Sequence, residues 1–206
     1  MKDDVRPVED SVRLLLPEKY LTPFLPLLQK GVAVKTRMGV TVADFLCGHF
    51  GLSPEYVKKR IQTIFLDGEP VDDEDSARVR DGAVLALSSA MPGLLGATLR
   101  KGSPFQAMRR EISHRENRPG EAEKNRQGTV TVKLFNFMIP EMAGIVLQRG
   151  ITLENRSFGK ILVKILEEAG NHPVSAEKNH EEIGLRELRD RMEKTPGTVF
   201  LRVETG

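Results

Sequence analysis

Leu27-Leu28-Gln29-Lys30-Gly31-Val32-Ala33-Val34 recurs 119 residues later as Val146-Leu147-Gln148-Arg149-Gly150-Ile151-Thr152-Leu153. In both stretches an apolar connection leads through a glycine into a short β-forming run, which predicts a strand led by glycine. At this offset five of the 25 positions from 27 to 51 are identical. Identity of that level is weak, so the order of the elements around the two stretches is the better evidence for an internal repeat.

The same order of elements is predicted on both sides of the middle of the chain. Each side reads as a strand, an apolar connection, a glycine-led strand, a helix, a variable stretch and a glycine-led terminal strand. The terminal strands begin at Gly82-Ala83-Val84-Leu85 and at Gly197-Thr198-Val199-Phe200. This order predicts a duplicated unit.

The elements of the first unit can be placed from turn and cap signals. We expect a strand at 11–16 with the strand 32–37 as its hairpin or meander neighbour. Thr41, with Asp44 three residues later, is typical of a helix N-cap. A second helix is expected from Ser53-Pro54 to Ile61. The expected strands that follow are 63–66, 69–71 and 83–88, with turns at Asp67-Gly68 and Asp81-Gly82.

This order resembles the β-grasp (ubiquitin-like) fold, and more narrowly its sulfur-carrier branch: the small subunit of molybdopterin synthase and the thiamine-biosynthesis sulfur carrier. The residues that carry the resemblance are Gly39–Leu46, Leu66–Val71 and Val79–Leu87, within about 11–93. They are mainly turn and cap residues, so they imply the fold more than the activity. The expected fold class is therefore α+β, with two tandem β-grasp domains at 1–95 and 128–206 joined by a partly helical, charged linker at 96–127.

The sequence departs from the sulfur carriers at the place where their chemistry occurs. Those proteins end in a free Gly-Gly whose carboxylate becomes a thiocarboxylate. Here the corresponding stretch reads Ser89-Ala90-Met91-Pro92-Gly93-Leu94-Leu95-Gly96 and the chain continues, while the second unit stops at Thr205-Gly206. Sulfur carriage would therefore require processing after Gly93, which is kept as a further alternative.

The positive charge is concentrated in the middle of the chain. Residues 1–95 hold 12 Lys and Arg against 14 Asp and Glu, residues 96–127 hold 8 against 4, and residues 128–206 hold 11 against 11. A dedicated nucleic-acid binder usually spreads a basic face over a folded domain. Within the middle segment, Ser103-Pro104 predicts a helix to about His114, and the polar stretch 115–128 is interpreted as a tether.

Two further resemblances concern the stretch between 41 and 71. Residues 44–46, 51–61 and 66–71 are similar to the RNA-binding module named after ribosomal protein four of the small subunit, although Gln62-Thr63 replaces its glycine and Asp72–Asp75 adds acidic charge. The segment Thr41–Phe45 followed by His49 also resembles the TGS domain. The first resemblance implies an RNA-binding accessory protein as the alternative function, with salt-sensitive contacts to phosphates. The cations assigned to it are Lys58, Lys59, Arg60, Arg100, Lys101, Arg109 and Arg110.

No pattern typical of an enzyme or a metal site was found in the sequence. Cys47 and His49 are two apart on an expected helix and therefore point in different directions. His172 and His180 lack close metal-ligand spacing. We therefore expect no catalytic residues, no metal and no cofactor. No apolar run is long enough to span a membrane, and a single cysteine with an acidic amino-terminal start favours a cytoplasmic protein.

The preferred interpretation of function is a non-enzymatic cytoplasmic adaptor that binds another protein through sheet faces or edges of its ubiquitin-like units. An unusually apolar stretch follows the first unit, and exposed apolar patches mark interaction sites. The expected partner-binding residues are Met91, Leu94, Leu95 and Leu99.

Overall fold

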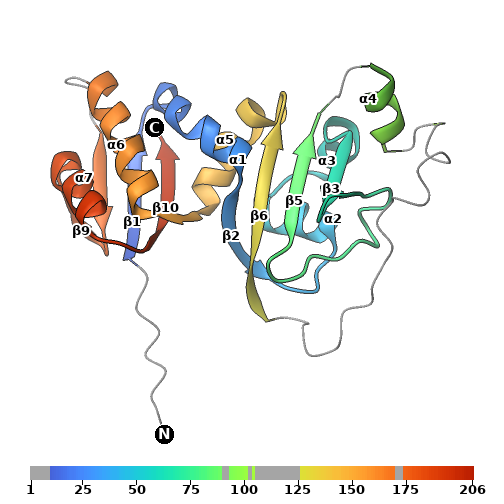
Figure 1. Ribbon diagram of the computed structural model, residues 1–206, viewed down its shortest axis with the longest axis horizontal. Coiled ribbons are helices and arrows are strands. Elements are labelled where there is room, and N and C mark those ends of the chain that lie inside the picture. The colour runs from blue at the N-terminus through green and yellow to red at the C-terminus, as the bar shows by residue number, and fades with distance from the viewer. Residues whose placement is uncertain (1–9, 90–92, 102–103, 105–125, 170–173) are drawn as a thin grey trace, which may run out of the picture.

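The computed structural model describes residues 10–89, 93–101, 104, 126–169 and 174–206. Its strands form one mixed sheet of ten strands in the order β4-β3-β5-β6-β2-β7-β10-β1-β8-β9 (Figure 1). We call the first five strands of this order the first half-sheet and the last five the second half-sheet. The strand bounds are β1 Asp10–Leu16, β2 Val32–Arg37, β3 Thr63–Leu66, β4 Glu69–Pro70, β5 Val84–Ser88, β6 Gln127–Phe135, β7 Ile151–Glu154, β8 Ser175–Lys178, β9 Glu181–Glu182 and β10 Thr198–Thr205.

The helices bury one face of this sheet. Along β6, Val130, Val132 and Leu134 are fully buried, whereas Thr131 and Lys133 between them are half-buried on the opposite face. In Figure 1, α6 and α7 lie in front of the second half-sheet, and α2 and α3 lie behind the first. A wide sheet twists from one edge to the other, so the same face turns toward the viewer at one end and away at the other. The helical bounds are η1 Glu18–Phe24, α1 Leu25–Lys30, α2 Val42–Asp44, η2 Phe45–His49, α3 Pro54–Arg60, α4 Gly93–Leu99, α5 Met138–Arg149, α6 Asn155–Ala169 and α7 Leu185–Lys194.

The predicted helix starts are confirmed by their cap hydrogen bonds. The Thr41 hydroxyl accepts from the Asp44 N–H at 3.0 Å, and α2 begins at the next residue and continues as the π-helical segment η2. The Ser53 hydroxyl accepts from the Tyr56 N–H at 3.1 Å and Pro54 is the first residue of α3. Each bond satisfies a helix-end donor that would otherwise be unpaired.

The repeated stretch forms the same local structure in both places. Gly31 follows α1 with φ +118°, and Gly150 follows α5 with φ +100°. Their N–H groups donate to the carbonyls of Leu27 at 2.9 Å and Val146 at 3.2 Å. Such positive φ values favour glycine, so the repeated glycine ends a helix and turns the chain into β2 or β7.

The expected pairing of the first strand was wrong. β1 does not pair with β2; it lies between β10, to which it is parallel, and β8, to which it is antiparallel. The place beside β2 is taken by β6, which pairs antiparallel with β2 and parallel with β5. A hairpin needs a short turn, whereas β1 and β2 are joined by the helical segments η1 and α1. These segments carry the chain from the second half-sheet to the first, and α5 carries it back from β6 to β7.

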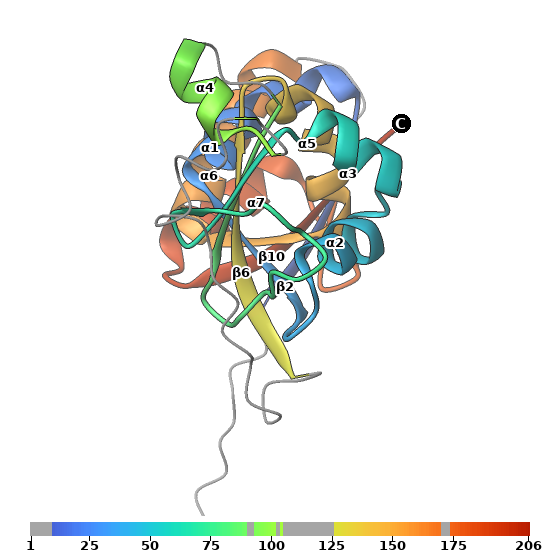
Figure 2. The same ribbon diagram turned by 90° about the vertical axis from the view of Figure 1, so that its right-hand side faces the viewer.

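The coarse class prediction is confirmed as a mixed α/β protein, but a tandem arrangement of two β-grasp domains is not confirmed. The first half-sheet contains β6 from the range 128–206, and the second contains β1 from the range 1–95. The two half-sheets meet at one residue pair, Ala33 with Thr152. In Figure 2 the first half-sheet faces the viewer and the second lies behind it, and α1 contacts α5 between them. The helix expected at 103–114 and most of the tether lie outside the described residues.

No helix among the described residues is both long and apolar enough to cross a membrane. The longest described helix, α6, has 15 residues, whereas a membrane span needs about 20.

The strand exchange predicts that the two parts of the chain stay together after cleavage. A protease site introduced between residues 115 and 120 should yield two fragments that elute as one species without denaturant, because each fragment supplies an interior strand to the other half-sheet. Size-exclusion chromatography after cleavage is the measurement. Separate elution of two folded fragments would contradict the exchanged pairing.

A second prediction concerns Gly150, where an added Cβ would lie 2.3 Å from the Phe200 ring. Gly150→Ala should lower the free energy of unfolding by about 1–3 kcal/mol, because it combines an unfavourable φ with a steric overlap. Gly48→Ala is the matched control, since an added Cβ there meets nothing within 4 Å and the position is helical. Denaturant unfolding gives the free energy of unfolding of both variants. Equal values would show that the close approach to Phe200 is absent.

Candidate functional surfaces

One face of the first half-sheet, which no helix of the described residues covers, contains an apolar hollow of about 460 Å³. Strand register builds it: Phe65 on β3 is opposite Ala86 on β5, which is opposite Lys133 on β6. These side chains alternate with the fully buried ones and so point to the same open face. The lining residues are Phe65, Gly68, Val84, Ala86, Ser88, Lys133, Phe135 and Asn136.

One rim of this hollow carries an exposed aromatic ring. Asn136 has φ +54°, and its side-chain amide donates to the Ser88 hydroxyl at 2.9 Å. This turn ends β6 and directs Phe137, which is 67% exposed, away from the core. A large exposed ring beside an apolar hollow is typical of an interaction surface.

The predicted partner-binding stretch lies beyond the same end of the sheet. The backbone of Leu94 and Leu95 is in α4, beyond the carboxyl end of β5 (Figure 1), and Leu99 in the same helix is half-buried. Met91 lies outside the described residues. After α4 the chain is fixed by Lys101, whose N–H donates to the Gln62 carbonyl at 2.9 Å and whose ammonium contacts Glu74 at 2.8 Å.

Three of the seven cations predicted to contact RNA are paired with carboxylates. Lys59 contacts Glu55 at 2.7 Å, and Lys101 is almost buried against Glu74, with only 10% of its side chain exposed. Arg60 forms an ion pair with Glu141. Lys58 and Arg100 are exposed, and Arg109 and Arg110 lie outside the described residues. The paired acids reduce the positive field that phosphate binding requires.

Arg60, Tyr56 and Glu141 join α3 to α5. The Tyr56 hydroxyl donates to the Glu141 carboxylate at 2.8 Å, and the Arg60 guanidinium donates to the same carboxylate. These bonds hold the pKa of Glu141 below its usual value, with the Arg60 bond the larger cause. Burial, followed by the bond to Glu141, raises the pKa of Tyr56 to about 12. The cluster therefore stabilises contact between the two parts of the chain.

A hollow of about 450 Å³ on the second half-sheet is charged and internally compensated. Arg13 donates to Glu204 at 2.6 and 3.0 Å and lies 3.7 Å from Glu177. The bond from Arg13 holds the pKa of Glu204 below its usual value. Because each charge already has an opposite neighbour, this hollow offers little net charge to a ligand.

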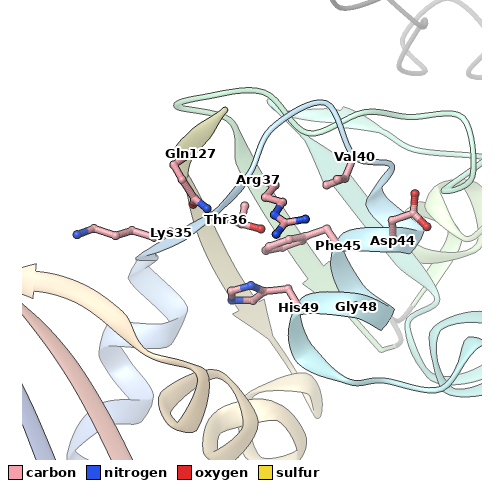
Figure 3. A pocket seen from close by; sticks show the side chains of 9 residues that line it. All are labelled: Lys35, Thr36, Arg37, Val40, Asp44, Phe45, Gly48, His49 and Gln127. Atoms are coloured by element: carbon pink, nitrogen blue, oxygen red, sulfur yellow. The ribbon is translucent and has the colours of Figure 1, made fainter. Parts of the chain in front are cut away.

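A third hollow, of about 390 Å³, lies beside β2 (Figure 3). β2 pairs with β6 along its whole length, but on the other side only Ala33 has a strand partner among the described residues. Arg37 and Gln127 point toward the Phe45 ring, whereas Lys35 and Asp44 extend to opposite sides. The lining residues are Lys35, Thr36, Arg37, Val40, Asp44, Phe45, Gly48, His49 and Gln127.

Cys47 and His49 have different surroundings. Burial, the largest cause, and nearby acids raise the pKa of the half-buried Cys47 thiol, which disfavours its reactive thiolate. His49 stacks on Phe45 with ring centroids 5.3 Å apart, and burial together with Arg149 lowers its pKa. Among the described residues no group of three or more His, Cys, Asp or Glu could hold a metal ion; His172 lies outside that part of the chain.

Sequence reasoning missed the apolar hollow and the hollow beside β2. Lys133 joins Phe65 and Ala86 only because β6 enters the first half-sheet. A local signal existed in the alternation of β6, where Thr131 and Lys133 separate fully buried residues and Phe135 follows the last of them. Alternation marks an exposed face, but it does not say which strands share it.

Comparison with known proteins finds no matching family model, no matching curated protein and no matching solved structure.

The Glu141 cluster generates a pH prediction. Its pKa in the folded protein lies below the ordinary value of 4.5, so its contribution to stability is complete above about pH 4.5 and is lost as the pH falls through the folded-state pKa. The difference in free energy of unfolding between the wild type and Glu141→Gln should therefore be largest near pH 7 and shrink toward pH 3.

The measurement is denaturant unfolding across this pH range. Glu55→Gln is the control, because Glu55 and Lys59 form an exposed pair within one helix, and such pairs contribute little. A Glu141→Gln difference that does not change with pH would refute the role of the carboxylate charge.

Proposed function

We propose that this protein is a non-enzymatic cytoplasmic adaptor that binds a partner protein on the open face of its first half-sheet. The observation that carries the proposal is the hollow of about 460 Å³ lined by Phe65, Val84, Ala86 and Phe135. A rigid sheet positions these residues, and a concave apolar surface with few polar groups is suited to receiving a partner's side chains.

The chemistry of the hollow specifies the kind of partner. Of the described residues that line the hollow, Lys133 is the one cation and none is a carboxylate. A matching partner presents apolar side chains that fill the hollow and one acidic side chain that pairs with the Lys133 ammonium. Burying the apolar part supplies affinity, and the charge pair supplies orientation.

The surface continues beyond the hollow toward α4. Phe137 is exposed on one rim, and the half-buried Leu99 belongs to the helix beyond the carboxyl end of β5. We assign Leu94 and Leu95 of this helix to the same partner. Specific protein interfaces bury about 800 Å² on each partner, so we propose that the contact extends from the hollow to α4.

We also propose that each half-sheet corresponds to one β-grasp unit with its first strand exchanged. Support comes from the first half-sheet, where parallel β5 and β6 form the centre and antiparallel β3 and β2 flank them. β4 follows β3 at the edge. In the second half-sheet, parallel β10 and β1 hold the equivalent centre.

The two alternatives receive less support. RNA binding would use cations of which Lys59, Arg60 and Lys101 are paired with carboxylates. Processing after Gly93 into a sulfur carrier would remove β6, which separates β5 from β2. Retention of RNA at low salt would restore the first alternative, and a cellular form ending at Gly93 would restore the second.

The adaptor proposal predicts that Ala86→Glu abolishes partner binding. Ala86 is at the centre of the hollow, so a carboxylate there removes apolar volume and repels the acidic residue of the partner. The experiment captures partners from native lysate with the tagged full chain, identifies them, and measures their affinity. We expect a loss of about tenfold or more.

The matched control is Ser175→Glu, which adds the same charge at an exposed strand position of the second half-sheet. Lys133→Glu should weaken binding of the wild-type partner. The same variant should bind a partner whose acidic residue is replaced by lysine. Full binding by Ala86→Glu, or an equal loss of affinity in Ser175→Glu, would contradict the adaptor proposal.

Leu94 and Leu95 give an independent test of the extended surface. Replacing both by serine should weaken binding of the same partner. The melting temperature should stay unchanged if α4 contacts the partner rather than the core. Unchanged affinity would restrict the surface to the sheet and its Phe137 rim.

A further inference from the structure

The hollow beside β2 is separate from the apolar hollow and differs from it in chemistry. It lies where β2 loses its second strand neighbour, because β7 begins at Ile151 and pairs with β2 only through Thr152. One side of the hollow is the end of β2 and the start of β6. The other side is η2, with Phe45, Gly48 and His49.

The groups that converge on this hollow are mainly hydrogen-bond donors. Figure 3 shows the Arg37 guanidinium and the Gln127 amide pointing toward the Phe45 ring, with the Thr36 hydroxyl near them and the His49 ring across the opening. A guanidinium offers a fork of donors that matches the two oxygens of a carboxylate or phosphate. The one carboxylate of the lining, Asp44, extends away from this group.

The charge near the hollow is positive. Arg37 and Lys35 line it against the single acid Asp44. Arg149 at the end of α5 adds a third cation, close enough to η2 that it affects the pKa of His49 and that its guanidinium would lie 3.0 Å from a Cβ on Gly51. An anion is therefore attracted to this region.

Two features indicate free space and an unsatisfied polar atom. A Cβ added to Gly48 would meet nothing within 4 Å, although glycine lowers the stability of a helix. The Nε2 atom of His49 is buried and has no hydrogen-bond partner among the described residues. Such an atom is costly to leave unpaired, and the open space at Gly48 leaves room for a bound molecule beside the His49 ring.

The geometry points to a binding site for a small organic anion, whose carboxylate or phosphate is held by Arg37 and Gln127 and whose apolar body lies against the half-buried Val40. The Phe45 ring beneath is almost completely buried, so it supports the lining of the hollow and offers the ligand no more than an edge. About 390 Å³ is within the range of small-molecule sites. The anion reaches Arg37 from the side of β2 on which no strand of the described residues lies.

The test uses the full chain and phenyl phosphate or benzoate as probes in two-dimensional amide NMR. Saturable shifts of the Gly48, His49 and Gln127 amides are expected with one of these probes. Arg37→Gln should weaken binding about tenfold or more through the lost charge-assisted hydrogen bonds. Gly48→Leu should remove binding, because it fills the hollow at a position where a side chain fits.

Lys58→Gln is the matched control: it removes an exposed cation on α3, outside the lining, and should bind the probe like the wild type. Thermal melting of all three variants shows whether they are folded. The inference is overturned if neither probe shifts these amides, if folded Arg37→Gln and Gly48→Leu bind normally, or if benzyl alcohol or inorganic phosphate binds as well as the best probe.

Discussion

β6 forms two sets of hydrogen bonds at once, antiparallel with β2 along Val32–Arg37 and parallel with β5 along Val84–Ser88. It shares the centre of the first half-sheet with β5, and its buried side chains Val130, Val132 and Leu134 lie in the core, where β6 contacts α1 and α5. Because β6 comes from the second part of the chain, while β1 from the first part lies inside the second half-sheet, neither part can close its sheet alone. The continuity of the sheet and the position of both proposed sites depend on this exchange.

The exchange also explains why the surfaces have different characters. On the first half-sheet β6 places Lys133 and Phe135 among the apolar residues of β3 and β5, so an open hollow forms with one cation. On the second half-sheet β1 places Arg13 between Glu177 and Glu204, and the charges neutralise one another. A partner that recognises apolar side chains is therefore suited to one half-sheet only. The duplicated order of elements has not produced two equivalent binding faces.

At the junction, the strands of the two half-sheets separate after one residue pair, and the helices supply the remaining contact. Glu141 on α5 accepts hydrogen bonds from Tyr56 and Arg60 on α3, which fixes the helices across the opening. The same separation leaves the end of β2 without a strand neighbour on its β7 side among the described residues, next to the hollow at Arg37. The stabilising contact and the proposed anion site are consequences of the same geometry.

The sequence by itself determined the local structure. Thr41 and Ser53 start helices through their hydroxyls, and Gly31 and Gly150 end helices at positive φ; each interaction joins residues close in the chain, so the residue types are sufficient to predict it. The extent of strands such as 63–66 and of α3 was predicted for the same reason. Only the tertiary structure decided which strands are neighbours. β1 and β6 have similar alternating patterns and either could pair with β2 or β10, since strand pairing depends on hydrogen bonds between distant backbones and on the path of the helices between them. The meeting of Phe65, Ala86 and Lys133, and of Arg37 with Gln127, follows from that choice, which no local pattern encodes.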